Sequence, residues 1–194
     1  MPEHDALAER EHALEEGYFQ QKDHQLIERM RKAAADEVER AALERSTGLS
    51  DPALLQELLE LGFTFATASL LPLVPVLEVA WAEGGISPAE RELIEKLAHS
   101  RGIDDASPAG GLLRQWMTIR PDDKVFQRAG RLIAAMLGSA SHKAFGLTAQ
   151  ELVAYCEKVA EASGGIFGTR LRSVTPEERA LLTRIATDLN ARPR

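Results

Sequence analysis

The chain is poor in cysteine and in aromatic residues, and its N-terminus lacks the composition of a secretion signal. Cys156 is the only cysteine among 194 residues, so no disulfide can form within the chain and nothing indicates an oxidising compartment. We expect this cysteine to be a small buried apolar residue. Residues 1–10 are too acidic and too polar for a secretion signal, so we expect a cytoplasmic protein.

Long apolar runs are also missing. The longest uncharged stretch, residues 61–77, contains Pro72 and Pro75 and is shorter than the roughly 20 apolar residues of a membrane-spanning helix. We therefore expect these residues to lie in the core of a folded domain. Peripheral association with a membrane through the same stretch is the alternative.

The chain has no excess of basic charge. Its net charge is −7, and residues 1–60 hold 15 acidic residues against 7 basic ones, while the remaining residues are almost balanced. Because a surface that binds phosphates must be basic, this distribution argues against a nucleic-acid partner.

Signatures of catalysis are missing as well. The five histidines, at positions 4, 12, 24, 99 and 142, do not show the helical spacing of a zinc metalloprotease. Residues 164–168 read Gly-Gly-Ile-Phe-Gly, but no predicted strand precedes them, so we expect a helix end and turn rather than a phosphate loop. The sequence predicts a protein that is not an enzyme.

Helix-forming residues dominate the N-terminal part of the chain. Residues 5–46 contain no proline and one glycine, Gly17, and they are rich in Glu, Arg, Lys, Gln and Ala, which predicts one long helix. Its apolar positions form a thin, broken stripe that is too narrow to be surrounded by a core. We therefore expect a helical arm over residues 1–46 and a separate helical domain over residues 47–194.

Several shorter helices are expected in the second part. Asp51 and Pro52 start a helix that runs to residue 61. The apolar residues 63–82 predict the central helix of the domain, kinked or restarted near Pro72. Two more helices are expected, over residues 111–118 and 122–138. With no convincing strand, the predicted fold class is all-α, a helical bundle preceded by a long N-terminal helix.

An internal duplication supports a bundle. Residues 79–98 match residues 159–186, with eight extra residues in the loop of the second copy, so the repeat units cover about 63–98 and 151–189. Each unit reads as a helix, a glycine turn and a capped helix. Two such units packed face to face would make one bundle.

Three capping boxes are expected at helix starts. In this motif a hydroxyl accepts a hydrogen bond from the third helical amide, and a glutamate at that position accepts one from the cap residue's own amide. The pairs are Ser87 with Glu90, Thr148 with Glu151 and Thr175 with Glu178.

Two glutamates of the first repeat are candidate metal ligands. Glu83 ends one predicted helix and Glu90 begins the next, so both carboxylates can converge across the turn at Gly84 and Gly85. Hard divalent cations prefer such oxygen ligands, but the capping box alone also explains Glu90. A divalent cation is the only cofactor that the sequence suggests.

The same hairpin carries a family resemblance. Ala-Trp-Ala-Glu-Gly-Gly-Ile at 80–86, followed by Ser-Pro-Ala-Glu-Arg-Glu-Leu-Ile at 87–94, resembles the helical domain of the tellurite-resistance TerB-like family. The likeness covers about residues 63–189 and implies an all-helical domain with a duplicated hairpin, a link to stress response and acidic metal-binding positions. The usual acid of the first motif is aspartate, and here it is Glu83.

Two neighbouring aromatic residues stand out in the acidic arm. Tyr18 and Phe19 lie among charged residues, and aromatic side chains dominate the energetics of helix-in-groove binding. We expect them to be anchors for a protein partner. The alternative is that both rings pack back onto the protein's own helical domain.

The arm also resembles a known inhibitor. Residues 10–32, which begin Arg-Glu-His-Ala-Leu-Glu-Glu-Gly-Tyr-Phe, are similar to the inhibitory helix of the mitochondrial F1-ATPase inhibitor protein. That helix enters a catalytic interface of the F1 motor of ATP synthase and blocks ATP hydrolysis. The resemblance implies a partner-binding set of Arg10, Glu11, Glu15, Tyr18, Phe19, Ile27 and Met30.

Two functions follow from these patterns. The first is a non-enzymatic regulatory protein whose N-terminal helix docks into and inhibits an ATPase, with F1 as the partner that the resemblance implies. The second is a TerB-like stress-response or scaffold protein that binds a divalent cation through acidic residues. The sequence leaves the oligomeric state open.

Overall fold

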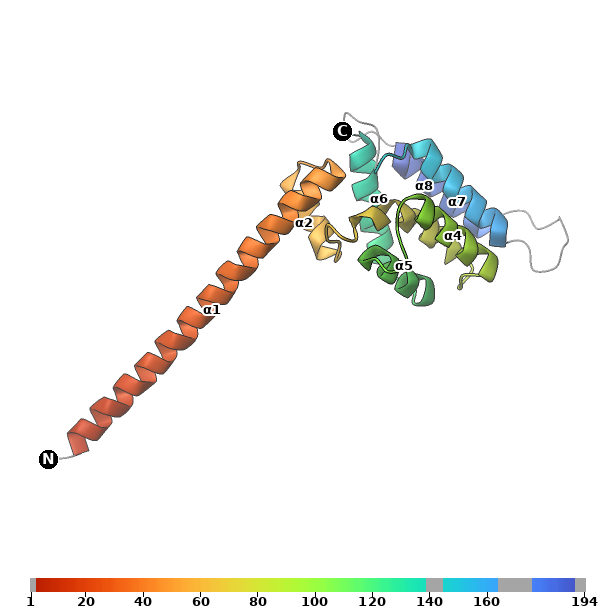
Figure 1. Cartoon of the computed structure of the whole chain (residues 1–194). Coiled ribbons are helices and arrows are strands. Elements are labelled where there is room, and N and C mark those ends of the chain that lie inside the picture. The colour runs from red at the N-terminus through yellow and green to blue at the C-terminus, as the bar shows by residue number, and fades with distance from the viewer. Residues whose placement is uncertain (1–2, 139–144, 164–175, 191–194) are drawn as a thin grey trace. The chain divides into compact units, whose positions relative to one another are not determined.

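The computed structural model of the chain describes residues 3–138, 145–163 and 176–190 (Figure 1). Every regular element in these residues is a helix, so the predicted all-α class is confirmed. The chain divides into two compact units, Met1–Ala41 and Ala42–Arg194, called here the N-terminal unit and the helical body.

A single helix, α1 (Glu3–Thr47), makes up the regular structure of the N-terminal unit, and its residues 42–47 belong to the helical body. The body contains Leu43, whose side chain is fully buried. The helix ends because Gly48 adopts a φ of +71°, a left-handed conformation that glycine takes without strain. The Thr47 hydroxyl donates to the Leu43 carbonyl oxygen at 2.7 Å and so satisfies one acceptor of the last turn.

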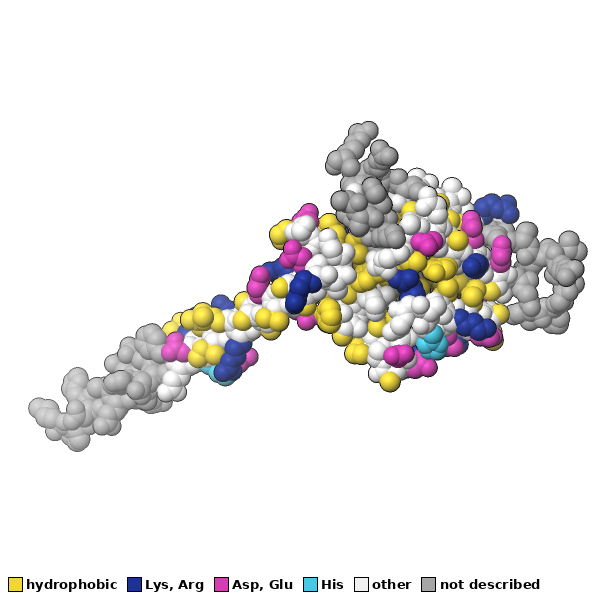
Figure 2. Space-filling model, turned by 45° about the horizontal axis from the view of Figure 1, so that its top comes forward, with side chains coloured by type: hydrophobic (Ala, Val, Ile, Leu, Met, Phe, Trp, Pro, Cys, Tyr) yellow, Lys and Arg dark blue, Asp and Glu magenta, His cyan; other side chains and the backbone are white. Residues whose placement is uncertain are grey.

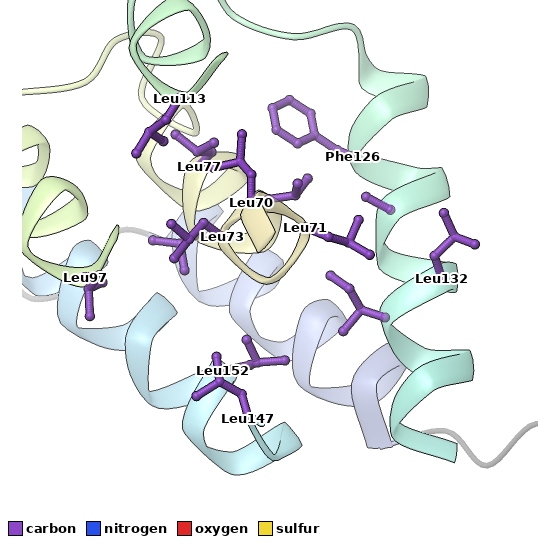
Figure 3. Close-up of a cluster of buried hydrophobic side chains, with 14 of the residues drawn as sticks. Leu70, Leu71, Leu73, Leu77, Leu97, Leu113, Phe126, Leu132, Leu147 and Leu152 are labelled. Atoms are coloured by element: carbon purple, nitrogen blue, oxygen red, sulfur yellow. The ribbon is translucent and has the colours of Figure 1, made fainter. Parts of the chain in front are cut away.

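The helical body surrounds one short central helix. Val74–Ala80 forms α3, which packs against α4, α6, α7 and α8 and has six of its seven residues buried. Figure 3 shows Leu70, Leu71, Leu73 and Leu77 in the middle of the buried cluster, near Phe126 of α6. The other elements are α2 (Pro52–Glu60), the 3-10 helix η1 (Ala68–Leu73), α4 (Pro88–Ser100), α5 (Pro108–Thr118), α6 (Asp123–Gly138), α7 (Ala149–Ser163) and α8 (Pro176–Asn190).

The central helix is much shorter than residues 63–82. Residues 63–64 are irregular, residues 65–67 form a turn, residues 68–73 form the 3-10 helix, and the α-helix starts only at Val74. Pro72 and Pro75 cause this, because neither has an N–H to donate and each ring clashes with the carbonyl four residues earlier in an α-helix. The restart near Pro72 is therefore confirmed, while the helical start at residue 63 is wrong.

Two of the three predicted capping boxes are confirmed. The Ser87 hydroxyl accepts from the Glu90 amide at 3.3 Å, and the Ser87 amide donates to the Glu90 carboxylate at 2.7 Å. Thr148 and Glu151 make the same two hydrogen bonds, at 3.3 and 2.8 Å. The third pair, Thr175 with Glu178, lies outside the described residues and side chains.

Helix α5 begins earlier than residue 111, which corrects the predicted boundary. The Ser107 hydroxyl accepts from the Gly110 amide at 3.0 Å, and Pro108 occupies the first turn. The predicted helix starts at Gly111, whereas Pro108, Ala109 and Gly110 also belong to α5. Gly110 is needed there, because a Cβ at this position would lie 2.2 Å from the Asp104 carbonyl oxygen.

Candidate functional site

Large apolar side chains are exposed along α1. Figure 2 shows apolar and charged side chains side by side on this helix. The exposed fractions are 56% for Tyr18, 54% for Leu26, 47% for Ile27, 64% for Met30 and 71% for Val38. Exposed single apolar residues are ordinary, but five of this size on one helix form a surface that a partner can cover.

The exposed residues between positions 18 and 30 share one side of the helix. At 3.6 residues per turn, Tyr18, Leu26 and Met30 fall within an arc of about 120°. Ile27 lies about 60° beyond Met30, so the four residues together span about half of the helix circumference. We call these four residues the apolar edge of α1.

Charged side chains lie both within and beside the apolar edge: at 3.6 residues per turn, Lys22 falls between Tyr18 and Leu26, and Arg31 falls beyond Ile27. The Lys22 ammonium lies 5.4 Å from the centre of the Tyr18 ring, a cation–π contact. Arg31 and Glu28 form an ion pair at 3.3 Å, with both side chains more than half exposed. Such an exposed pair contributes little to stability, so both charges remain available to a partner.

The seven partner-binding residues expected from the sequence all lie on α1. Tyr18, Ile27 and Met30 are at least about half exposed. The side chains of Arg10, Glu11, Glu15 and Phe19 lie outside the part of the structure that is described, although their backbone is helical.

The two candidate metal ligands differ in their surroundings. Glu83 is exposed in the turn between α3 and α4, whereas Glu90 is buried and its carboxylate accepts the hydrogen bond from the Ser87 amide. Within the described ranges, no three or more His, Cys, Asp or Glu side chains are grouped so that they could hold a metal ion. The structure thus accounts for Glu90 by its capping box.

Two other residues of this hairpin hold the end of α5. The Trp81 indole N–H donates to the Trp116 carbonyl oxygen at 2.9 Å, and the Arg91 guanidinium donates to the Met117 carbonyl oxygen at 2.9 Å. These carbonyls belong to the last turn of a helix, where no intrahelical amide satisfies them. The motif residues Trp81 and Arg91 therefore have a structural role.

The helical body also contains a cleft of about 490 Å³ between α3, α6 and α8. Its apolar walls include Pro75, Phe126, Ala134, Ile185 and Leu189, and its charged groups are Glu78, Arg131, Arg184 and Asp188. The sequence analysis did not identify this cleft. The small residues Gly130 and Ala134, one turn apart on α6, are the only local signal of open space at this face.

Ion pairs fix the arginine on the α6 side of the cleft. The Glu57 carboxylate accepts from Arg128 at 2.7 Å and from Arg131 at 2.9 Å, and Arg128 also donates to Glu60 at 2.8 Å. Partial burial alone would raise the pKa of Glu57, but the two arginines outweigh it and hold the pKa below its usual value. Glu57 is therefore charged at neutral pH and holds Arg131 at the cleft.

The single cysteine lies in the core of the body, as expected. Cys156 on α7 is fully buried, and burial, together with the charges of Glu78 and Glu157, raises its pKa to about 12. Because the thiolate is the reactive form, this thiol is chemically inert at neutral pH in the folded protein.

The apolar stretch considered for membrane association is mostly used by the core. From Ala68 to Leu77 every side chain except that of Ser69 is buried. None of the helices in the described ranges has both the length and the apolar character needed to cross a membrane.

Compared with protein-family models, with curated proteins and with solved structures, the chain has no match.

Proposed function

We propose that this protein is a non-enzymatic regulator that docks α1 into a groove of an ATPase, and that the F1 part of ATP synthase is this partner. The apolar edge of α1 carries the proposal. Tyr18 and Met30 expose more than half of their side-chain surface on a helix with charged flanks. The identity of the ATPase rests on the resemblance of residues 10–32 to the F1 inhibitory helix.

Helix-in-groove binding would explain why α1 carries exposed apolar side chains. A helix that inserts an apolar edge into a groove uses side chains that recur at helical spacing, and Leu26 lies eight positions after Tyr18 and four before Met30. Covering them removes apolar surface from water, which stabilises a complex by roughly 25 cal/mol per Å² before the costs of association. Lys22 falls within the arc of this edge and Arg31 falls beside it, so both supply charges to the contact with a partner.

The helical body has a supporting role in this proposal. We infer a TerB-like body, supported by two helix pairs, α3 with α4 and α7 with α8, that correspond to the duplicated segments. Helix α7 packs against α3, α4 and α8, as expected for two hairpins in one bundle. In this role the body holds the end of α1 through Leu43 and offers a second contact surface.

An ATP hydrolysis assay tests the function directly. The full chain is added to F1 prepared from the organism that carries it, and we expect hydrolysis to fall to a small residual rate. The double substitution Tyr18→Ala/Phe19→Ala should weaken this inhibition by about 100-fold or more, since aromatic anchors each contribute about 2 kcal/mol or more and every 1.4 kcal/mol is tenfold.

The matched control is Val38→Ala. Val38 is an exposed apolar residue of the same helix, outside residues 10–32, so its loss should leave inhibition unchanged. Val38→Ala should keep the melting temperature of the native protein, because substitutions at exposed sites change stability by no more than about 0.5 kcal/mol, and the melting temperature of the double variant is measured beside it. F1 that hydrolyses ATP equally fast with and without the native protein would refute the proposal.

A further inference from the structure

We propose that the cleft between α3, α6 and α8 binds an amphiphilic amine, a primary ammonium ion with an apolar tail. Its tail lies against the apolar walls, and its ammonium group donates to the Asp188 carboxylate. The inference concerns the helical body alone and is independent of docking by α1.

The cleft has the size and lining of a site for a small ligand. Pockets for small molecules measure about 300 to 1,000 Å³ and are mostly apolar with a few charged groups, and this cleft measures about 490 Å³. Pro75, Phe126, Ile185 and Leu189 supply apolar walls. A Cβ built on Gly130 would meet no atom within 4 Å, so α6 leaves room for an apolar tail there.

Both arginines of the lining have their charge balanced by an ion pair. Arg131 on α6 donates to the Glu57 carboxylate at 2.9 Å, and Arg184 on α8 donates to the Glu78 carboxylate. Glu57 keeps its negative charge at neutral pH, because the neighbouring arginines hold its pKa below the usual value. The two guanidinium groups therefore do not make the cleft a site for an anion.

Asp188 is the lining residue whose charge is left unbalanced. It lies one turn after Arg184 on α8, but that guanidinium is bound to Glu78, and Asp188 forms no ion pair with any residue in the described ranges. With the pair of Arg128 and Glu60 beside the cleft, the charges around it are three arginines and four carboxylates. One negative charge is in excess, and a ligand with a single positive charge balances it.

A primary ammonium group suits this lining better than a quaternary one. It is a compact charge with three N–H donors, so it makes charge-assisted hydrogen bonds to a carboxylate. Proteins bind quaternary ammonium groups within cages of aromatic rings. Phe126 is the one aromatic residue in the described lining, and its ring already has the Arg120 guanidinium 5.3 Å from its centre. A methylated head group would therefore lose its hydrogen bonds without gaining an aromatic cage.

Four ligands with the same tail separate the contribution of the head group from that of the tail. Decylammonium, decyltrimethylammonium, decanol and decanoate are titrated into the full chain by calorimetry, each below the concentration at which it forms micelles. We expect decylammonium to bind with one molecule per chain and to raise the melting temperature. The other three should bind at least about fivefold more weakly, because each lacks the positive charge or the N–H donors that Asp188 requires.

Two substitutions locate the binding. Gly130→Leu fills the cleft where a side chain meets no obstacle and should abolish decylammonium binding while the melting temperature is kept or raised, since leucine favours a helix over glycine. Asp188→Asn should weaken decylammonium binding at least about fivefold and leave decanol binding unchanged. Glu83→Gln is the matched control, because it removes one exposed carboxylate outside the cleft and changes the net charge equally, so it should bind as the native chain does.

Three results would overturn the inference. The first is no saturable binding of decylammonium, and the second is binding of any of the other three ligands as tight as that of decylammonium. The third is a decylammonium affinity that Gly130→Leu or Asp188→Asn leaves unchanged, or that Glu83→Gln lowers as much as Asp188→Asn does. None of these results bears on the inhibition of F1, which depends on α1.

Discussion

The substitution Phe63→Ala is expected to lower the free energy of unfolding of the helical body by about 3–5 kcal/mol. Phe63 has no exposed surface, and its ring meets the Trp116 ring edge-to-face at 5.8 Å between centroids. Alanine would leave a cavity and remove an aromatic pair worth about 0.5–1.5 kcal/mol beyond the burial itself. Urea denaturation followed by tryptophan fluorescence measures the change.

Phe65 provides the matched control two residues away. Its side chain is 58% exposed, so Phe65→Ala should lower the free energy of unfolding by less than about 1 kcal/mol. Equal losses for the two variants would contradict the position of Phe63 in the core.

Gly110→Ala is expected to lower the free energy of unfolding by about 1–3 kcal/mol, although alanine is the better helix former. The added methyl group would lie 2.2 Å from the Asp104 carbonyl oxygen and 3.0 Å from the Asp105 Cα. Because both are backbone atoms, the loop before α5 must move away from the helix. Thermal and urea denaturation of the full chain measure the loss.

The neighbouring substitution Gly111→Ala separates this clash from a general effect of glycine. Its Cβ would meet only the Arg114 guanidinium, at 4.0 Å, so the variant should be as stable as the native chain or more stable by up to about 1 kcal/mol. A Gly110→Ala variant as stable as Gly111→Ala would show that the loop does not approach the helix this closely.

Local signals made much of the helical body predictable from sequence. The Asp51–Pro52 start of α2 and the capping boxes at Ser87 and Thr148 depend on residues at most three positions apart, and the structure has all of them. The errors lie at helix starts. Pro72 and Pro75 shorten the central helix, and α5 begins at Pro108, after the Ser107 cap, instead of at residue 111.

The candidate sites differ in how far sequence could predict them. The apolar edge of α1 lies within one helix, and the sequence named three of its four residues, Tyr18, Ile27 and Met30, as partner-binding, whereas Leu26 was not among them. The cleft needs three helices that are distant along the chain, and its Arg184–Glu78 ion pair joins residues 106 positions apart. No periodic pattern encodes such a pair, because it depends on how the helices pack.

The two proposals assign separate roles to the two units. The N-terminal unit presents the apolar edge to a protein, whereas the helical body offers a cleft to a small ligand. Their tests are independent, because the variants at Tyr18 and Phe19 lie on α1 and those at Gly130 and Asp188 lie on α6 and α8.

Thiol labelling of a Met30→Cys variant tests the central claim most directly. The native Cys156 is buried with a pKa of about 12, so the introduced thiol is the one that reacts quickly with a maleimide at neutral pH. Met30 is 64% exposed, so labelling of the free protein should be as fast as that of an unstructured peptide. A saturating concentration of F1, added together with Mg-ATP, should slow the labelling strongly. Slow labelling of the free protein, or equal rates with and without F1, would contradict the docking role of α1.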